Sequence, residues 1–205
     1  MNDQIKQKTS NLLKFIHLSE KLKCTLRHGW TSTGRQESVA EHSWRLSLLA
    51  ILLSPHIGNK LNMERVLGMS IIHDLCEALT GDTPFFEALE GSSAKQKKAI
   101  LEREAMKTLI GSLNKESGDQ LKLLWEEYNK TESEEAKFVH ALDKLEAQIQ
   151  QNEADISTWN DFEKKSIFTY LDKFCDYNYF IKLFKDEVRE ESADKLNQSL
   201  SETSR

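Results

Sequence analysis

The sequence predicts an all-α fold, because apolar residues recur three and four positions apart along almost the whole chain. Only two prolines and eight glycines interrupt this pattern in 205 residues. A chain of that length can bury a substantial core as one domain. We therefore expect a single-domain bundle of about eight helices.

The expected helices are the stretches over which this spacing continues between breaks. In chain order they span residues 3–23, 38–53, 62–79, 93–112, 117–130, 133–151, 158–173 and 175–191. The second of them also has a start signal, because Ser38 and Glu41 fit a capping box. Residues 192–205 are polar, so we expect a disordered tail after a domain that spans residues 1–191.

Composition and charge narrow the functional classes. Lys and Arg number 28 against 33 Asp and Glu, and the two signs are interleaved, which disfavours polymeric nucleic acid as a partner. The N-terminus lacks a signal-peptide pattern and no apolar run could span a bilayer, so we expect a cytoplasmic protein without membrane contact. The three cysteines have no CxxC spacing, which indicates neither a disulfide framework nor a thiolate zinc site.

Two predicted loops have unusual compositions for passive connectors. Residues 27–37 contain two arginines, two glycines and Trp30. Residues 80–86 directly follow the helix expected at 62–79. Function often resides on loops held by a rigid scaffold, so both loops are candidate walls of a site.

A His-Asp pair, His73 and Asp74, interrupts the apolar run 66–78. Burying an unpaired carboxylate is costly, and a divalent cation would compensate it. His42 and Asp143 offer further imidazole and carboxylate ligands in apolar helical settings, and this donor set suits a borderline divalent metal. The alternative for any one histidine is a hydrogen-bonded core residue, but the conjunction of four groups favours the metal.

Helical spacing places each candidate ligand on a core-facing side. The stripe that contains His42 also contains Leu46, Leu49 and Leu53. The side that contains Asp143 also contains Ala136, Val139, His140 and Ala147. His140 is an alternative ligand, although its place one turn before Asp143 favours a supporting or core role.

Glu77 is a candidate catalytic carboxylate. It lies four residues beyond His73 and three beyond Asp74, so a continuous helix would project it from the same face, one turn on. That position suits a hydrogen bond to a water molecule better than direct metal binding. The alternative is a solvated carboxylate near a helix end. Glu41, by contrast, is expected to serve only as a helix cap.

Four motifs in order carry a family resemblance. They are Leu26-Arg27-His28-Gly29-Trp30, Glu37-Ser38-Val39-Ala40-Glu41-His42-Ser43, His73-Asp74-Leu75-Cys76-Glu77-Ala78-Leu79-Thr80-Gly81-Asp82 and Ala136-Lys137-Phe138-Val139-His140-Ala141-Leu142-Asp143. Over residues 10–185 the chain resembles the HD-domain 5′-deoxynucleotidases, helical metal-dependent phosphohydrolases that remove phosphate from deoxyribonucleoside 5′-monophosphates.

The resemblance implies a role for each matching residue. The implied metal ligands are His42, His73, Asp74 and Asp143; the implied catalytic carboxylates are Glu77 and Asp82; Arg27 would bind phosphate and Trp30 would pack near the sugar. Some family members place Trp directly after this Arg, whereas His28 and Gly29 intervene here. The resemblance also implies a homodimer and one divalent cation, Mn²⁺ or Co²⁺ first, with Fe²⁺, Ni²⁺, Zn²⁺ or Mg²⁺ as alternatives.

Other functions stay open at this point. Another HD-type phosphohydrolase could act on a cyclic nucleotide, a dinucleoside polyphosphate or a nucleoside triphosphate, and larger substrates would need more basic residues around Arg27 and Arg35. A non-catalytic, metal-stabilised interaction module is the third alternative, against which the carboxylates Glu77 and Asp82 argue. Four apolar C-terminal residues could form an internal seam or a dimer surface: Tyr177, Phe180, Ile181 and Phe184.

Overall fold

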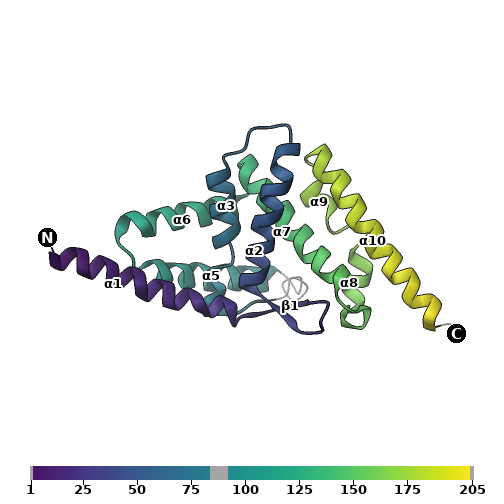
Figure 1. Ribbon diagram of the computed structural model, residues 1–205, viewed down its shortest axis with the longest axis horizontal. Helices are drawn as coiled ribbons and strands as arrows, with labels where there is room; N and C mark the ends of the chain where they lie inside the picture. Colours follow the sequence, from purple (N-terminus) through teal and green to yellow (C-terminus); the bar gives the residue numbers. More distant parts are fainter. Residues whose placement is uncertain (1, 84–91, 204–205) are drawn as a thin grey trace.

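The computed structural model describes residues 2–83 and 92–203, and most of them are helical (Figure 1). The α-helices are α1 (Asn2–Ser19), α2 (Val39–Leu53), α3 (Met63–Ile72), α4 (Glu77–Thr80), α5 (Ser92–Ile110), α6 (Lys115–Lys130), α7 (Glu134–Glu153), α8 (Asp161–Ser166), α9 (Asp172–Cys175) and α10 (Tyr179–Thr203). Short 3₁₀ turns are η1 (Glu20–Lys23), η2 (Ser54–His56) and η4 (Ile156–Thr158). The predicted all-α class is confirmed.

Helix α7 is the centre of the molecule and packs against α2, α3, α6, α9, α10 and strand β1 (Leu26–Trp30). Its buried apolar residues lie on more than one side, as expected for a helix that is enclosed by others. Its buried polar residues are therefore exceptions that need partners. They are Asp143, Glu146, Gln148 and Gln150.

Two apolar clusters surround this arrangement. The larger one joins α2, α3 and α7 to the C-terminal helices, and includes Leu46, Met69, Leu142 and Ile181. The smaller one lies between α5, α6, the end of α3 and the start of α2, and includes Val39, Ile72, Met106 and Trp125. Helices α1 and α10 flank the body, with the two termini at opposite ends of its long axis (Figure 1).

Residues 27–37, predicted as a loop, contain a small sheet. Strand β1 pairs antiparallel with β2 (Gln36–Ser38), and Trp30 lies opposite Gln36. Gly34 has a φ of +82° in the connecting turn, a conformation that favours glycine. The hairpin packs on α7, so this stretch is held rigidly against the core.

Three predicted helix boundaries differ in the structure. The helix expected at 62–79 breaks into α3 and α4, joined by a turn at residues 73–76. The helix expected at 158–173 is divided into α8 and α9. The expected tail after residue 191 is helical as far as Thr203, because Ser192 and Lys195 bond to Asn152 on α7 and thereby tie α10 down.

Other predictions concern the surface and the second loop. The C-terminal residues Ile181, Phe180 and Phe184 pack into the larger apolar cluster, which makes them an internal seam. Residues 84–86 of the predicted loop lie outside the described residues. Within the described parts of the chain, no helix is both long and apolar enough to cross a membrane.

Candidate active site

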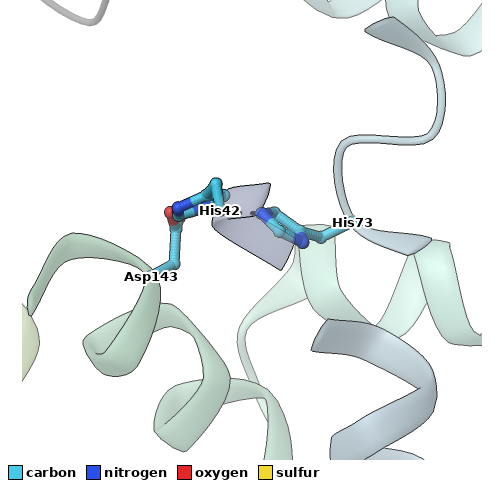
Figure 2. A group of neighbouring side chains, drawn as sticks. All are labelled: His42, His73 and Asp143. Atoms are coloured by element: carbon cyan, nitrogen blue, oxygen red, sulfur yellow. Dashed lines mark ion pairs between the residues drawn. The ribbon is translucent and has the colours of Figure 1, made fainter. Parts of the chain in front are cut away.

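Three predicted metal ligands converge from three segments of the fold (Figure 2). His42 lies in the first turn of α2, behind the predicted capping box of Ser38 and Glu41, which the structure contains. His73 is the residue that ends α3, and Asp143 lies in the middle of α7. One donor atom from each residue lies within 4.8 Å of the other two, and all three side chains are buried.

His42 and His73 direct the same ring nitrogen, Nε2, towards the place where the three side chains meet. The Nδ1 atom of His42 bonds to Glu146 Oε2, and the Nδ1 atom of His73 lies 3.0 Å from the carbonyl oxygen of Ser70. These acceptors place the proton on Nδ1, which leaves the Nε2 lone pair for a metal. Both Nε2 atoms are buried without a hydrogen-bond partner. The two orphaned nitrogens beside a carboxylate fit a divalent metal ion.

Asp143 presents one oxygen to the histidines and has the other occupied. Its Oδ2 accepts a hydrogen bond from the Tyr128 hydroxyl at 2.7 Å and forms an ion pair with Lys144 Nζ at 2.8 Å. Its Oδ1 lies 3.2 Å from His42 Nε2 and 4.0 Å from His73 Nε2. Burial alone would raise the pKa of Asp143, but Lys144, His42 and His73 hold it well below the ordinary value. The site therefore keeps an ionised carboxylate.

The negative charge around His42 favours a cation between the two histidines and Asp143. Burial and Arg27 would lower the pKa of His42, but Glu146 and Asp143 outweigh them and raise it to about 9. Asp74 adds to this charge, since its Oδ2 lies 3.0 Å from His73 Nε2. Asp74 falls outside the group of three mutually close donors, yet its side chain reaches the same place.

A cavity of about 330 Å³ opens beside these residues. Its walls include six of the eight predicted site residues: Arg27, Trp30, Asp74, Glu77, Asp82 and Asp143. His42 and His73 lie behind the wall, 0% and 3% exposed. Further lining residues come from α5, α6, α7, α8 and the turn after α8, and include Lys98, Tyr128, Lys144, Gln151, Glu163 and Tyr170. The fold thus gathers the four motifs around one hollow.

Glu77 faces the cavity from the start of α4 with a carboxylate that is 5% exposed. Its Oε2 atom is buried without a hydrogen-bond partner. Burial and the neighbouring carboxylates Asp74 and Asp82 raise the pKa of Glu77 to about 10. A nearby cation would lower the pKa of a carboxyl group that is raised in this way. This sensitivity suits a group that transfers protons.

Asp82 follows directly after the glycine that ends α4. Gly81 has a φ of +75°, which lets the chain turn sharply towards the hairpin. The backbone N–H of His28 donates to Asp82 Oδ2 at 3.3 Å, and the His28 ring lies 3.3 Å from Glu163 on α8. Trp30, at the end of β1, is half-buried in the cavity wall.

Arg27 reaches the cavity from β1, between two buried carboxylates. Its Nη1 atom lies 3.1 Å from Glu37 and 3.5 Å from Glu146. The combined charge of Glu146, Asp74 and Glu37 outweighs burial and raises the pKa of Arg27 further. By contrast, Arg35 bonds to Glu41 on the exposed side of the hairpin and does not line the cavity.

Sequence reasoning missed the groups that hold the ligands. Tyr128 and Lys144 fix Asp143, and Glu146 fixes His42. The signal for Glu146 was available, because a glutamate three residues after Asp143 shares its side of an apolar helix. His140 lines the cavity, and its ring stacks on Tyr128 with centroids 4.1 Å apart.

Comparison with known proteins agrees with this geometry. The family model for the HD domain matches residues 19–175. The 5′-deoxynucleotidase HDDC2 of Mus musculus is 34% identical over 158 residues, which cover 76% of this chain and 73% of that protein. The 5′-deoxynucleotidase hdd1 of Schizosaccharomyces pombe is 30% identical over 176 residues and covers 83% and 85% of the two chains.

A solved structure shares the fold over nearly the whole chain. It is named "Predicted metal-dependent phosphohydrolase" and comes from Magnetospirillum magnetotacticum MS-1. Its TM-score is 0.76 at 25% identity, with 92% of this chain and 97% of that chain covered. The resemblance carried by the four motifs is thereby confirmed, and the chain belongs to the HD-domain family, among the relatives of the 5′-deoxynucleotidases.

Proposed function

We propose that the protein removes the 5′-phosphate from deoxyribonucleoside 5′-monophosphates, using one divalent metal ion bound by His42, His73, Asp74 and Asp143. The observation that carries this proposal is the pair of buried, unpartnered Nε2 atoms of the two histidines beside an ionised carboxylate. Curated relatives at 34% and 30% identity are 5′-deoxynucleotidases, which supports the choice of substrate.

The bound ion would supply Lewis-acid polarisation of the phosphate and an acidified water. Arg27 binds two phosphate oxygens through its planar guanidinium and counters the charge that develops in the transition state. The carboxylates Glu37 and Glu146 hold this guanidinium at the cavity wall. Trp30 packs beside the sugar, because it lines the same cavity a short distance along β1.

The reaction adds water across the ester bond. A water oxygen forms a new bond to phosphorus, the bond from phosphorus to the 5′-oxygen breaks, and inorganic phosphate and the nucleoside leave. A cation in the site would lower the raised pKa of Glu77 and ionise its carboxyl group, whose buried, unpartnered oxygen then accepts the proton of the attacking water. Asp82 orients that water or returns a proton to the 5′-oxygen from the opposite end of α4.

A substrate screen tests the proposal. Purified protein is assayed for phosphate release from matched deoxyribo- and ribonucleoside 5′-monophosphates, with Mn²⁺, Co²⁺, Fe²⁺, Ni²⁺, Zn²⁺ or Mg²⁺ added to metal-free enzyme. We expect release from the deoxy series, fastest with Mn²⁺ or Co²⁺. Equal rates on both series would contradict the sugar preference, and no release from either would contradict the proposed reaction.

The structure favours a monophosphate over larger substrates. A polyphosphate would need further arginines near Arg27, and the candidate at Arg35 is paired with Glu41 outside the cavity. The lysines in the wall are also engaged, since Lys144 bonds to Asp143 and Lys98 bonds to the Thr83 carbonyl. The same panel, extended to nucleoside triphosphates and cyclic nucleotides, examines this preference.

The proposal includes assembly of the protein as a homodimer. Helix α2 exposes an apolar stripe at i, i+4, i+7 and i+8, and such stripes are typical of interfaces between subunits. It consists of Trp44, Leu48, Ile51 and Leu52. Light scattering of the wild type and of Trp44→Glu tests the dimer, which the variant should weaken.

The proposal also places the protein in the cytoplasm. Its three unpaired cysteines are consistent with a reducing compartment.

A further inference from the structure

Glu146 is the most enclosed carboxylate near the cavity, yet it does not line the cavity itself. Its side chain is 0% exposed, on α7, one turn after Asp143. Its Oε2 atom bonds to His42 Nδ1 and lies 3.5 Å from Arg27 Nη1. Its Oε1 atom accepts a hydrogen bond from Arg45 Nε at 2.7 Å. One carboxylate therefore joins a histidine of the metal site to the arginine of the phosphate site.

Each bond fixes an orientation that the site needs. In the neutral ring that would bind a metal, the bond from His42 Nδ1 to Glu146 keeps the proton on Nδ1, so that Nε2 faces the ion, and it stops the ring from turning over. Arg27 is held between Glu146 and Glu37, so its guanidinium stays at the cavity wall. Arg45 anchors the opposite oxygen of Glu146, which prevents the carboxylate from rotating away from His42.

We propose that Glu146 is a positioning residue that orients His42 and Arg27 together, so that metal binding and phosphate binding both depend on it. This inference rests on the proposed function, which makes His42 a metal ligand and Arg27 a phosphate contact. Glu146 does not line the cavity. Glu37, His42 and Glu146 form a second group of mutually close donors, but both oxygens of Glu146 already have partners in His42, Arg27 and Arg45, so we assign it a role through His42 and Arg27 and not as a ligand. Loss of such a supporting contact typically weakens metal affinity by about 10- to 100-fold.

Glu146→Gln is the sharpest variant, because it keeps the shape and removes one of two acceptors. The amide nitrogen must face either Arg45 or the pair of His42 and Arg27, and it cannot accept a proton from either. Glu153→Gln is the matched control. Glu153 lies on the same helix and bonds to the same Arg45 at 2.6 Å, but its side chain is 48% exposed and contacts no site residue.

The experiment measures binding rather than turnover. Isothermal titration gives the Kd of Mn²⁺ for each metal-free protein, and a second titration gives the Kd of inorganic phosphate for each Mn²⁺-loaded protein. We expect Glu146→Gln to weaken Mn²⁺ binding about 10- to 100-fold and to weaken phosphate binding as well. Glu153→Gln should stay within about threefold of the wild type for both, as expected for an exposed pair.

The outcomes separate this inference from the proposed function. A wild type that binds no Mn²⁺ overturns the metal site itself and the inference with it. A wild type and a Glu146→Gln variant that bind Mn²⁺ and phosphate equally well overturn only the positioning role. Equal weakening by both variants would assign the effect to Arg45 and also overturn it.

A measurement on the wild type covers the case in which Glu146→Gln does not fold. Long-range ¹H–¹⁵N spectra of the Zn²⁺-loaded protein report which nitrogen of His42 carries the proton. We expect a proton on Nδ1, towards Glu146, and a metal shift on Nε2. A proton on Nε2 with the metal on Nδ1 would contradict the geometry on which the proposal depends.

Discussion

The Tyr128 hydroxyl donates a hydrogen bond to Asp143 Oδ2 at 2.7 Å, across the contact between α6 and α7. The two residues are 7% and 4% exposed, so this bond is largely shielded from bulk water and its loss is costly. Lys144 bonds to the same oxygen, which leaves Oδ1 directed at the histidines. The orientation of a predicted ligand thus depends on a residue 15 positions earlier in the chain.

Tyr128→Phe should therefore weaken Mn²⁺ binding by about tenfold, because the carboxylate loses one of the two contacts that orient it. The ring volume is kept, so the packing against His140 should persist. Titration calorimetry of the metal-free protein measures the effect. Tyr179→Phe, at a side chain that is 77% exposed, is the control and should behave as the wild type. Unchanged affinity in Tyr128→Phe would show that Lys144 alone orients the ligand.

His73→Ala and Asp74→Ala should each abolish metal binding and activity. Either change removes a proposed ligand and leaves the remaining charged groups crowded without compensation. Metal analysis of the purified variants gives the answer. His17→Ala, on the exposed surface of α1, is the matched histidine control. Stoichiometric metal together with full activity in either site variant would rule out the proposed ligand set.

Arg27→Ala should lower kcat/KM by about ten- to a thousandfold, or about 1.4–4 kcal/mol in transition-state stabilisation. The reason is that charge-assisted bonds to phosphate strengthen as charge develops. Metal content should stay the same. Arg35→Ala is the control from the same hairpin, since its side chain points to Glu41. Full activity with a lowered Tm in Arg27→Ala would make this arginine structural.

Glu77→Gln should reduce turnover by about 10²- to 10⁴-fold, because an amide cannot accept the proton of the attacking water. The bound ion should remain, since Glu77 is proposed to contact the attacking water and not the metal. Anomalous scattering from crystals of the Mn²⁺-loaded variant, together with its rate on a deoxynucleoside monophosphate, tests both statements. An empty metal position would make Glu77 a ligand, and a near-normal rate would make it a bystander.

The raised pKa of Glu77 also predicts a pH dependence of stability in the metal-free protein. The folded-state pKa of about 10 exceeds the ordinary value of 4.5, so the stability it contributes is present below pH 4.5 and is lost as the pH rises towards 10. Gln does not titrate. The stability advantage of Glu77→Gln should grow by up to about 1.4 kcal/mol per pH unit above pH 5. Urea unfolding in a chelator at pH 5 and pH 7.5 measures it, and an equal difference at both values would contradict the shift.

Local patterns were enough to predict the start of α2 and to single out the candidate ligands. The pair His73 and Asp74 stands out inside an apolar run, and the capping box of Ser38 and Glu41 needs only three residues of separation. The end of α3 could not be predicted in this way. The turn at residues 73–76 contains no proline or glycine and depends on how these residues pack.

Features that depend on distant contacts could not be predicted in the same way. The strands β1 and β2 are three to five residues long and form because the hairpin rests on α7. The extension of α10 likewise depends on Ser192 reaching Asn152. The support from Glu146 to His42 joins residues 104 positions apart, which no local pattern encodes.

The three convergent ligands come from chain segments that are about 30 and 70 residues apart, around positions 42, 73 and 143. An ion held by all three acts as a cross-link that closes two long loops, in the manner of a disulfide, and its binding energy is partly folding energy. Such an ion would therefore fasten α2 and the end of α3 to α7 as well as polarise the substrate. Metal supply in the cell would then govern how long the protein survives as well as how fast it works.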